Sequence, residues 1–85
     1  ERIYAYLTDK LPKNAEVLEG RARMYLARGM KGFAQRDINE AFELLGGKAP
    51  ATLYRLRAEL NEGLGNRKAA AEDIQRAEAL ERSQP

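Results

Sequence analysis

Hydrophobic residues recur along this chain at steps of three and four residues, which is the spacing of one face of an α-helix. The pattern predicts four helices, over residues 15–28, 32–45, 51–64 and 67–82, and residues 1–8 indicate the end of a preceding helix that Pro12 stops. No segment alternates apolar and polar residues with β-branched enrichment, so we expect no strand. The chain is therefore predicted to be all-α, with about five helices.

Polar and glycine residues mark the predicted helix ends. Asn14 and Asn66 stand directly before two of the helices, where an Asn side chain can accept hydrogen bonds from the first free backbone N–H groups. Gly29 and Gly65 follow the first helix of each pair, where a glycine in the left-handed conformation ends a helix. Short turns of this kind predict helical hairpins.

Two stretches of the chain repeat one another at a spacing of 36 residues. The residues of the first stretch that recur are Ala15, Arg21, Ala22, Gly29, Ala34, Asp37, Ile38, Ala41 and Leu44. Their equivalents in the second stretch, in the same order, are Ala51, Arg57, Ala58, Gly65, Ala70, Asp73, Ile74, Ala77 and Leu80. A fixed period of this length indicates stacked supersecondary units. We expect one repeat domain over residues 1–85, with repeats at 13–48 and 49–85 and the second helix of a partial repeat at 1–12. Because the pattern starts partway through a repeat, we expect the chain to come from a longer protein.

Alanine recurs at the positions where paired helices must approach closely. Ala22 and Ala58 lie midway along the first helix of each pair, and Ala34 and Ala70 lie near the start of the second. A side chain of one carbon lets two helix axes come together. Four of the six aromatic residues are expected to pack between hairpins; they are Tyr4, Tyr6, Phe33 and Phe42.

The spacing of large, small and aromatic residues resembles the tetratricopeptide repeat (TPR). The first unit supplies Leu18, Ala22, Tyr25, Gly29, Ala34, Ile38 and Ala41, and the second supplies Tyr54, Ala58, Asn61, Gly65, Ala70, Ile74 and Ala77. Asn61 stands where the family usually has Tyr, and Arg21 and Arg57 stand where it often has Leu. The resemblance implies antiparallel hairpins stacked as a short right-handed α-solenoid. Pentatricopeptide repeats have a similar period, but we see no recurring pair that would read RNA bases.

The resemblance implies a partner-binding groove lined by the first helix of each repeat. Its residues would be Glu16, Glu19, Arg23, Leu26 and Ala27, and Thr52, Arg55, Glu59, Glu62 and Gly63. Arg23 and Arg55 could bind acidic groups of a partner while Leu26 supplies an apolar contact. Alternatively, Glu19–Arg23 and Arg55–Glu59 are i,i+4 pairs on a solvated helix. Glu59 replaces an Asn of the family members that grip chaperone carboxylates, which argues against that role.

Arg21 and Arg57 occupy the same repeat position and have two interpretations. They could form a basic ladder along one edge of the domain. Alternatively, their aliphatic stems cover neighbouring helices while the guanidinium groups stay in water, and we favour this reading.

The composition argues against catalysis and cofactor binding. The chain has no Cys and no His, so the commonest general base and the thiolate metal ligands are missing, and we expect no enzyme activity, metal or cofactor. The net charge of +2 is spread over interleaved charges, which argues against nucleic acid as a partner. No apolar run is long enough to cross a membrane. The sequence is compatible with a location in the cytoplasm and with one in a bacterial periplasm.

The expected function is therefore a protein–protein interaction scaffold that binds a peptide or helix of a partner protein. Residue usage rich in Arg, Ala, Leu and Gly resembles bacterial members of the family, which implies part of a larger assembly or export protein. The alternative is a structural spacer that self-associates through exposed terminal hairpin faces. Those faces would carry Ile3, Tyr4, Leu7, Ile74 and Leu80.

Overall fold

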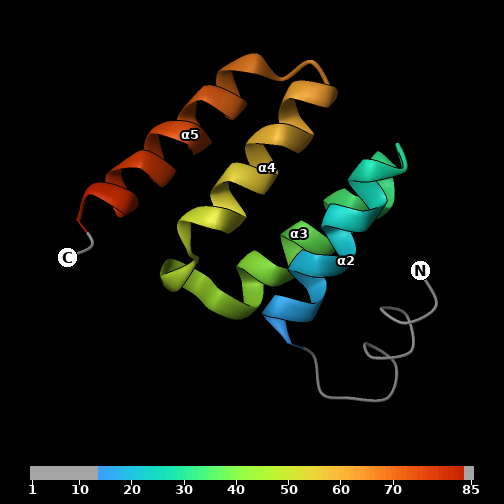
Figure 1. Ribbon diagram of the computed structural model, residues 1–85, viewed down its shortest axis with the longest axis horizontal. Helices are drawn as coiled ribbons and strands as arrows, with labels where there is room; N and C mark the ends of the chain where they lie inside the picture. Colours follow the sequence, from blue (N-terminus) through green and yellow to red (C-terminus); the bar gives the residue numbers. More distant parts are fainter. Residues whose placement is uncertain (1–13, 84–85) are drawn as a thin grey trace. The chain divides into compact units, whose positions relative to one another are not determined.

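The computed structural model describes residues 14–83, and these residues are almost entirely helical (Figure 1). The helices are α2 (Ala15–Ala27), α3 (Lys31–Leu45), α4 (Ala51–Gly63) and α5 (Arg67–Arg82), with a short 3₁₀ helix, η1 (Gly46–Lys48), between α3 and α4. The described part of the chain has no strand, so the predicted all-α class is confirmed. The predicted helix at residues 1–8, with Ile3, Tyr4, Tyr6 and Leu7, lies outside the described residues.

The helices pair as two hairpins, α2 with α3 and α4 with α5. The chain divides into two compact units between Gly47 and Lys48, and each unit holds one hairpin. For the four predicted helices that lie in the described residues, every end is within one residue of the observed one. The stacking of the hairpins as a right-handed solenoid stays a prediction.

Small residues bring the helices of the first unit together. Leu18 and Ala22 of α2 are at most 1% exposed, and the α3 residues that share their burial are Ala34, Ile38 and Ala41. The buried positions of α3 follow one another at steps of three and four residues, so they form one helical face. Of the first-unit positions in the repeat pattern, these five are buried as predicted, whereas Tyr25 is half-buried.

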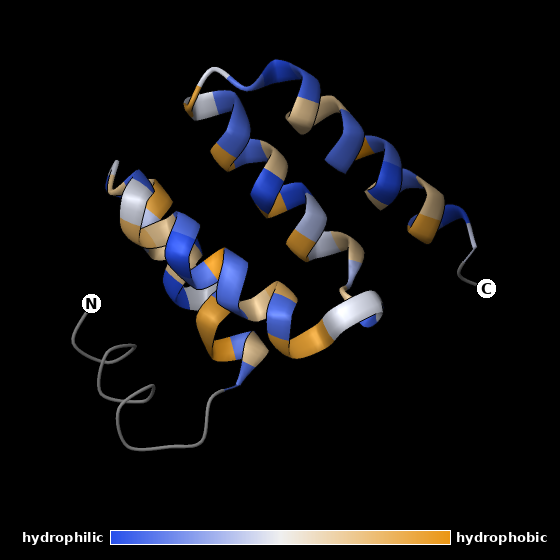
Figure 2. Ribbon diagram, turned by 180° about the vertical axis from the view of Figure 1, so that it is seen from behind, coloured by the Kyte–Doolittle hydropathy of each residue, from blue (hydrophilic) through white to orange (hydrophobic). Residues whose placement is uncertain are grey.

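The second unit repeats this arrangement with less complete burial in α5. Ala58 of α4 and Ala70 and Ala77 of α5 are buried, as the repeat predicts. Ile74, the repeat equivalent of the fully buried Ile38, is only half-buried, and so is Leu80. Hydrophilic residues dominate α5, and most of its hydrophobic residues are alanines (Figure 2). Its packing therefore depends mainly on small side chains.

The two hairpin turns share one backbone arrangement. Gly29 and Gly65 adopt φ angles of 76° and 84°, in the left-handed region that side chains disfavour. In the first turn the N–H of Met30 donates to the carbonyl of Tyr25 at 2.8 Å, and in the second turn an equal bond joins Asn66 to Asn61. This six-residue closure is a Schellman motif, and it satisfies a carbonyl at the end of the helix. The predicted glycine stops are confirmed.

The two predicted asparagine caps differ. The Oδ1 atom of Asn14 accepts hydrogen bonds from the N–H groups of Glu16 at 2.8 Å and Val17 at 3.4 Å, so this N-cap of α2 is confirmed. Asn66 stands at the N-cap position of α5, but its side chain accepts no capping hydrogen bond from the described helix. The prediction that Asn66 caps α5 through its side chain is therefore wrong.

Phe33 is 46% exposed, so it is not buried within its own hairpin, and its packing between hairpins stays a prediction. It precedes Ala34, which occupies the buried face of α3, and one residue turns a helix by about 100°. Phe33 therefore points to the side of that face, where its ring centroid lies 5.3 Å from that of Tyr25. Phe42, one residue after the buried Ala41, is half-buried.

Candidate functional site

The residues proposed for partner binding lie on α2 and α4, and most of them are exposed. The exposed ones are Glu16, Arg23, Ala27, Thr52, Arg55, Glu59, Glu62 and Gly63, whereas Glu19 and Leu26 are half-buried. Both first helices therefore present charged side chains to solvent within their own units.

On α2, the nearest neighbour of Arg23 is a carboxylate of the same helix. Its Nη2 atom donates a hydrogen bond to an Oε2 atom of Glu19 at 2.7 Å. This is the predicted i,i+4 pair, and the Arg23 side chain remains 56% exposed. Pairs of this kind stabilise a helix by about 0.2–0.5 kcal/mol, so Arg23 stays accessible to a partner at little cost.

On α4, Arg55 binds α5 instead of the predicted Glu59. Its Nε and Nη2 atoms donate to the two carboxylate oxygens of Glu81 at 2.8 and 2.7 Å. These hydrogen bonds raise the pKa of Arg55 and lower the pKa of Glu81. The pair joins the start of α4 to the end of α5, so the charge of Arg55 is already matched within the hairpin. The predicted Arg55–Glu59 pair is wrong because antiparallel packing brings Glu81 to Arg55.

Arg21 joins the two helices of the first unit through a buried carboxylate. Its Nε atom donates to Oδ2 of Asp37 at 2.7 Å, and its Nη2 atom donates to Oδ1 at 2.6 Å. The Asp37 side chain is fully buried, and that of Arg21 is 12% exposed. The hydrogen bonds to Asp37 are the main cause that raises the pKa of Arg21. The guanidinium also lies 5.8 Å above the centre of the Tyr25 ring.

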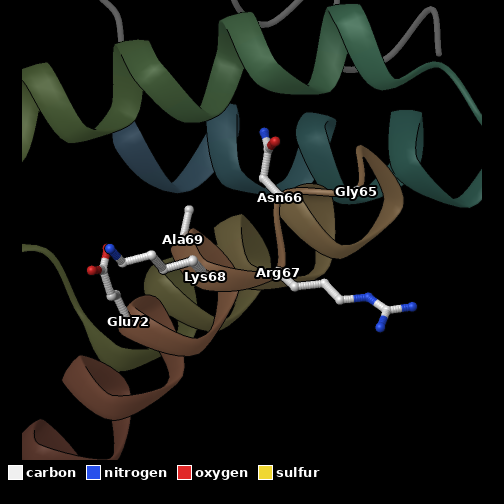
Figure 3. Close-up of a pocket in the computed structure, with 6 residues that line it drawn as sticks. All are labelled: Gly65, Asn66, Arg67, Lys68, Ala69 and Glu72. Atoms are coloured by element: carbon white, nitrogen blue, oxygen red, sulfur yellow. The ribbon is translucent and has the colours of Figure 1, made fainter.

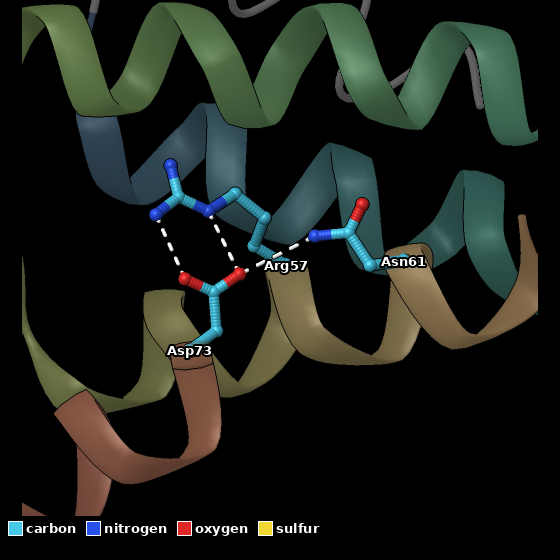
Figure 4. A network of polar contacts seen from close by, with 3 residues as sticks. All are labelled: Arg57, Asn61 and Asp73. Carbon is cyan, nitrogen blue, oxygen red and sulfur yellow. Dashed lines mark hydrogen bonds and ion pairs between the residues drawn. The ribbon is translucent and has the colours of Figure 1, made fainter. Parts of the chain in front are cut away.

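The second unit contains the same pair in a looser form (Figure 4). Arg57 donates to Asp73 through Nε at 3.0 Å and through Nη2 at 2.8 Å. The amide of Asn61 donates to the same carboxylate at 3.4 Å. The Arg57 side chain is 32% exposed and that of Asp73 is 9% exposed, so water reaches this pair more easily.

Neither interpretation of Arg21 and Arg57 describes the structure. Their guanidinium groups form neither a basic ladder nor solvated ends, because each binds an aspartate of the second helix. Asp37 and Asp73 were among the repeated residues, and each lies 16 residues after its arginine. That repeated spacing of opposite charges was the signal that could have identified both pairs.

A hollow lies beside the turn of each hairpin. In the first unit it measures about 390 Å³ and is lined by Met30, Gly32, Phe33 and Arg36. In the second unit it measures about 570 Å³ and is lined by Gly65, Asn66, Arg67, Lys68, Ala69 and Glu72. Each residue of the first lining has its repeat equivalent in the second, 36 positions later. Figure 3 shows the second hollow, in which Arg67 extends away from Lys68 and Glu72.

Residues 14–83 lack the features of two other kinds of site. They contain no cluster of three or more His, Cys, Asp or Glu side chains suited to a metal ion. None of the helices described is both long and apolar enough to cross a membrane.

The chain was also compared with known proteins. No family model, no curated protein and no solved structure matches it.

Proposed function

We propose that this chain is a protein-interaction module of tetratricopeptide-like repeats, which offers the outer faces of α2 and α4 to a peptide or helix of a partner protein. The observation that supports this proposal is that the charged residues of each first helix fall into two groups, one bound to the second helix and one exposed. The polar pairs Arg21–Asp37 and Arg57–Asp73 are turned towards the second helix, while other charged residues of the first helix are exposed. Exposed charges that a fold does not use internally favour a binding surface.

The charges of these faces favour a basic partner segment. On α4, Arg55 is matched by Glu81, which leaves Glu59 and Glu62 as the exposed charges. On α2, Arg23 is matched by Glu19, and Glu16 is exposed. Lys or Arg side chains of a partner would meet these carboxylates with complementary charge. We further propose a bacterial assembly or export protein as the setting, on the resemblance alone.

A pair of charge-reversed variants tests this function. Glu59→Lys/Glu62→Lys changes the outer face of α4, and Glu43→Lys/Glu72→Lys makes the same change of charge at exposed positions of the second helices. Both variants and the unchanged chain are immobilised and exposed to a lysate of the source organism, after thermal unfolding shows that all three are folded. We expect a protein that is retained by the chain and by the second variant and lost by the first.

Two other outcomes contradict the proposal. Equal retention by both variants would move binding away from the first helices. If nothing is retained and the molecular mass rises with concentration in sedimentation, the chain is a self-associating spacer.

A further inference from the structure

The hollow in the first unit has an aromatic residue and no carboxylate among its described lining residues, whereas its counterpart in the second unit has no aromatic residue and includes Glu72. Phe33 forms one wall of the hollow, and its side chain is 46% exposed. Burial of a Phe side chain is favourable in free energy, so this exposure leaves apolar surface that a partner could cover. Met30 lies beside it, and Met adapts its shape to whatever apolar group approaches. Phe, Met and Arg are enriched at the centres of protein interfaces.

The Phe33 ring is held in place before any partner arrives. Its centroid lies 5.3 Å from that of Tyr25, and the Arg36 guanidinium lies 5.3 Å from it. Tyr25 is in turn covered by Arg21, which Asp37 anchors. A ring ordered in this way loses little conformational freedom on binding, so its contact area contributes more fully to affinity.

Among the described residues that line the first hollow, the only charged side chain is the cation Arg36, whereas the second hollow has Glu72 beside Arg67 and Lys68. Among residues 14–83, the guanidinium of Arg36 contacts the Phe33 ring rather than a carboxylate. A cation beside an exposed apolar wall attracts a segment that carries both an apolar and an acidic side chain.

The repeat itself does not require this lining. The second unit forms the same turn with Asn66, Lys68, Ala69 and Glu72 in place of Met30, Gly32, Phe33 and Arg36. The chemistry of the first hollow is therefore particular to one unit, although the fold is common to both.

We propose that the hollow beside the α2–α3 turn is a second binding site, for a segment of a partner protein in which a bulky apolar side chain is flanked by carboxylates. The apolar side chain lies between Met30 and Phe33, and a carboxylate pairs with the Arg36 guanidinium, which can bind it through two hydrogen bonds. This site differs in charge from the faces of α2 and α4, whose exposed, unmatched charges are acidic. If this hollow does not bind peptides, the proposal that the faces of α2 and α4 bind a partner is unaffected.

The test uses displayed random twelve-residue peptides selected on the whole chain. The Phe33→Ala/Arg36→Glu variant serves for counter-selection, because it carries the residues that the second unit already tolerates at these positions, Ala69 and Glu72. Arg67→Glu is the matched control, since it introduces the same change of charge into the second hollow. We expect peptides with a Leu, Phe or Trp flanked by Asp or Glu.

The selected peptides are then measured individually. The dissociation constant should rise at least about tenfold in Phe33→Ala and in Arg36→Glu, and change little in Arg67→Glu. Amide NMR signals should shift on peptide addition at residues 30–36 and not at 66–72. The proposal is overturned if no peptide is enriched over the counter-selection, if enriched peptides lack carboxylates, or if Arg36→Glu binds them equally well. Phe33-dependent binding to phosphatidylglycerol vesicles without peptide binding would assign the hollow to a lipid surface instead.

Discussion

Arg21 and Asp37 join α2 to α3 through two hydrogen bonds of 2.7 and 2.6 Å, and the carboxylate that accepts them is fully buried. Burying two charges costs desolvation energy that their attraction only roughly offsets, so such a pair adds little net stability. Two directional bonds nevertheless fix how far α2 can slide or rotate along α3. We interpret the pair as a device that sets the register of the hairpin.

Loss of one partner should be far more costly than the net contribution of the pair. We predict that Arg21→Met lowers the free energy of unfolding by about 3–5 kcal/mol, because Asp37 is left charged in the core. Arg57→Met should cost less, since water reaches Asp73 and Asn61 still donates to it. Urea unfolding of the two variants gives the comparison.

The double variant Arg21→Met/Asp37→Leu is the control for this prediction. Because it removes both charges and keeps apolar bulk, it should recover most of the stability that Arg21→Met loses. Equal losses in Arg21→Met and Arg57→Met would show that burial of the carboxylate does not determine the cost.

The helices and their glycine stops could be predicted from the sequence because their signals are local. Periodicity and a glycine after each first helix are read within a few residues, and Gly29 and Gly65 stand where the structure needs a positive φ. The ion pairs were missed because they are not local. Asp37 lies 16 residues from Arg21, and Glu81 lies 26 residues from Arg55. Only the packing of one helix on the other brings these side chains together.

The candidate site could be predicted less well than the fold. The exposure of Arg23 and Glu59 follows from the resemblance and the helical period, and the structure agrees. The exposed Phe33 could not be foreseen, because a large aromatic residue near a helical stripe is usually buried. Its position depends on which neighbouring residue, Ala34, takes the place against α2.

Replacement of glycine by alanine at two positions of the first unit should change the free energy of unfolding in opposite directions. Gly29→Ala should lower the free energy of unfolding by about 1–2 kcal/mol, because a Cβ disfavours its φ of 76°. Gly32→Ala, inside α3 and with nothing within 4 Å of an added Cβ, should raise it by about 0.5–1 kcal/mol. Thermal unfolding of both variants measures the signs. If Gly29→Ala were neutral, the left-handed turn would not be needed.

The two N-cap asparagines give a second matched pair. Asn14→Ala removes an acceptor that binds the N–H groups of Glu16 and Val17, so we expect a loss of about 1 kcal/mol. Asn66→Ala should cost less than about 0.5 kcal/mol, since its side chain accepts no bond from the described residues of α5. Urea unfolding distinguishes the two cases. A larger loss for Asn66→Ala would reveal a role for that side chain outside capping.

The ion pair between Arg55 and Glu81 predicts a dependence of stability on pH. Hydrogen bonds from Arg55 lower the pKa of Glu81 in the folded chain, so the folded state binds a proton at Glu81 less readily than the unfolded state does. The contribution of Glu81 is therefore present above its ordinary pKa and disappears as the pH falls through the lowered value. Both side chains are exposed, so the effect is small and salt weakens it.

The measurement compares the melting temperature of the chain with that of Glu81→Gln between about pH 7 and pH 2. The chain should melt higher than the variant near neutral pH, and the difference should vanish in acid, where Glu81 is protonated and resembles the glutamine. Glu72→Gln is the control, because Glu72 is exposed near the start of the same helix, whereas Arg55 binds Glu81 near its end. A difference that persists unchanged in acid would mean that the substitution acts through packing rather than through the charge of Glu81.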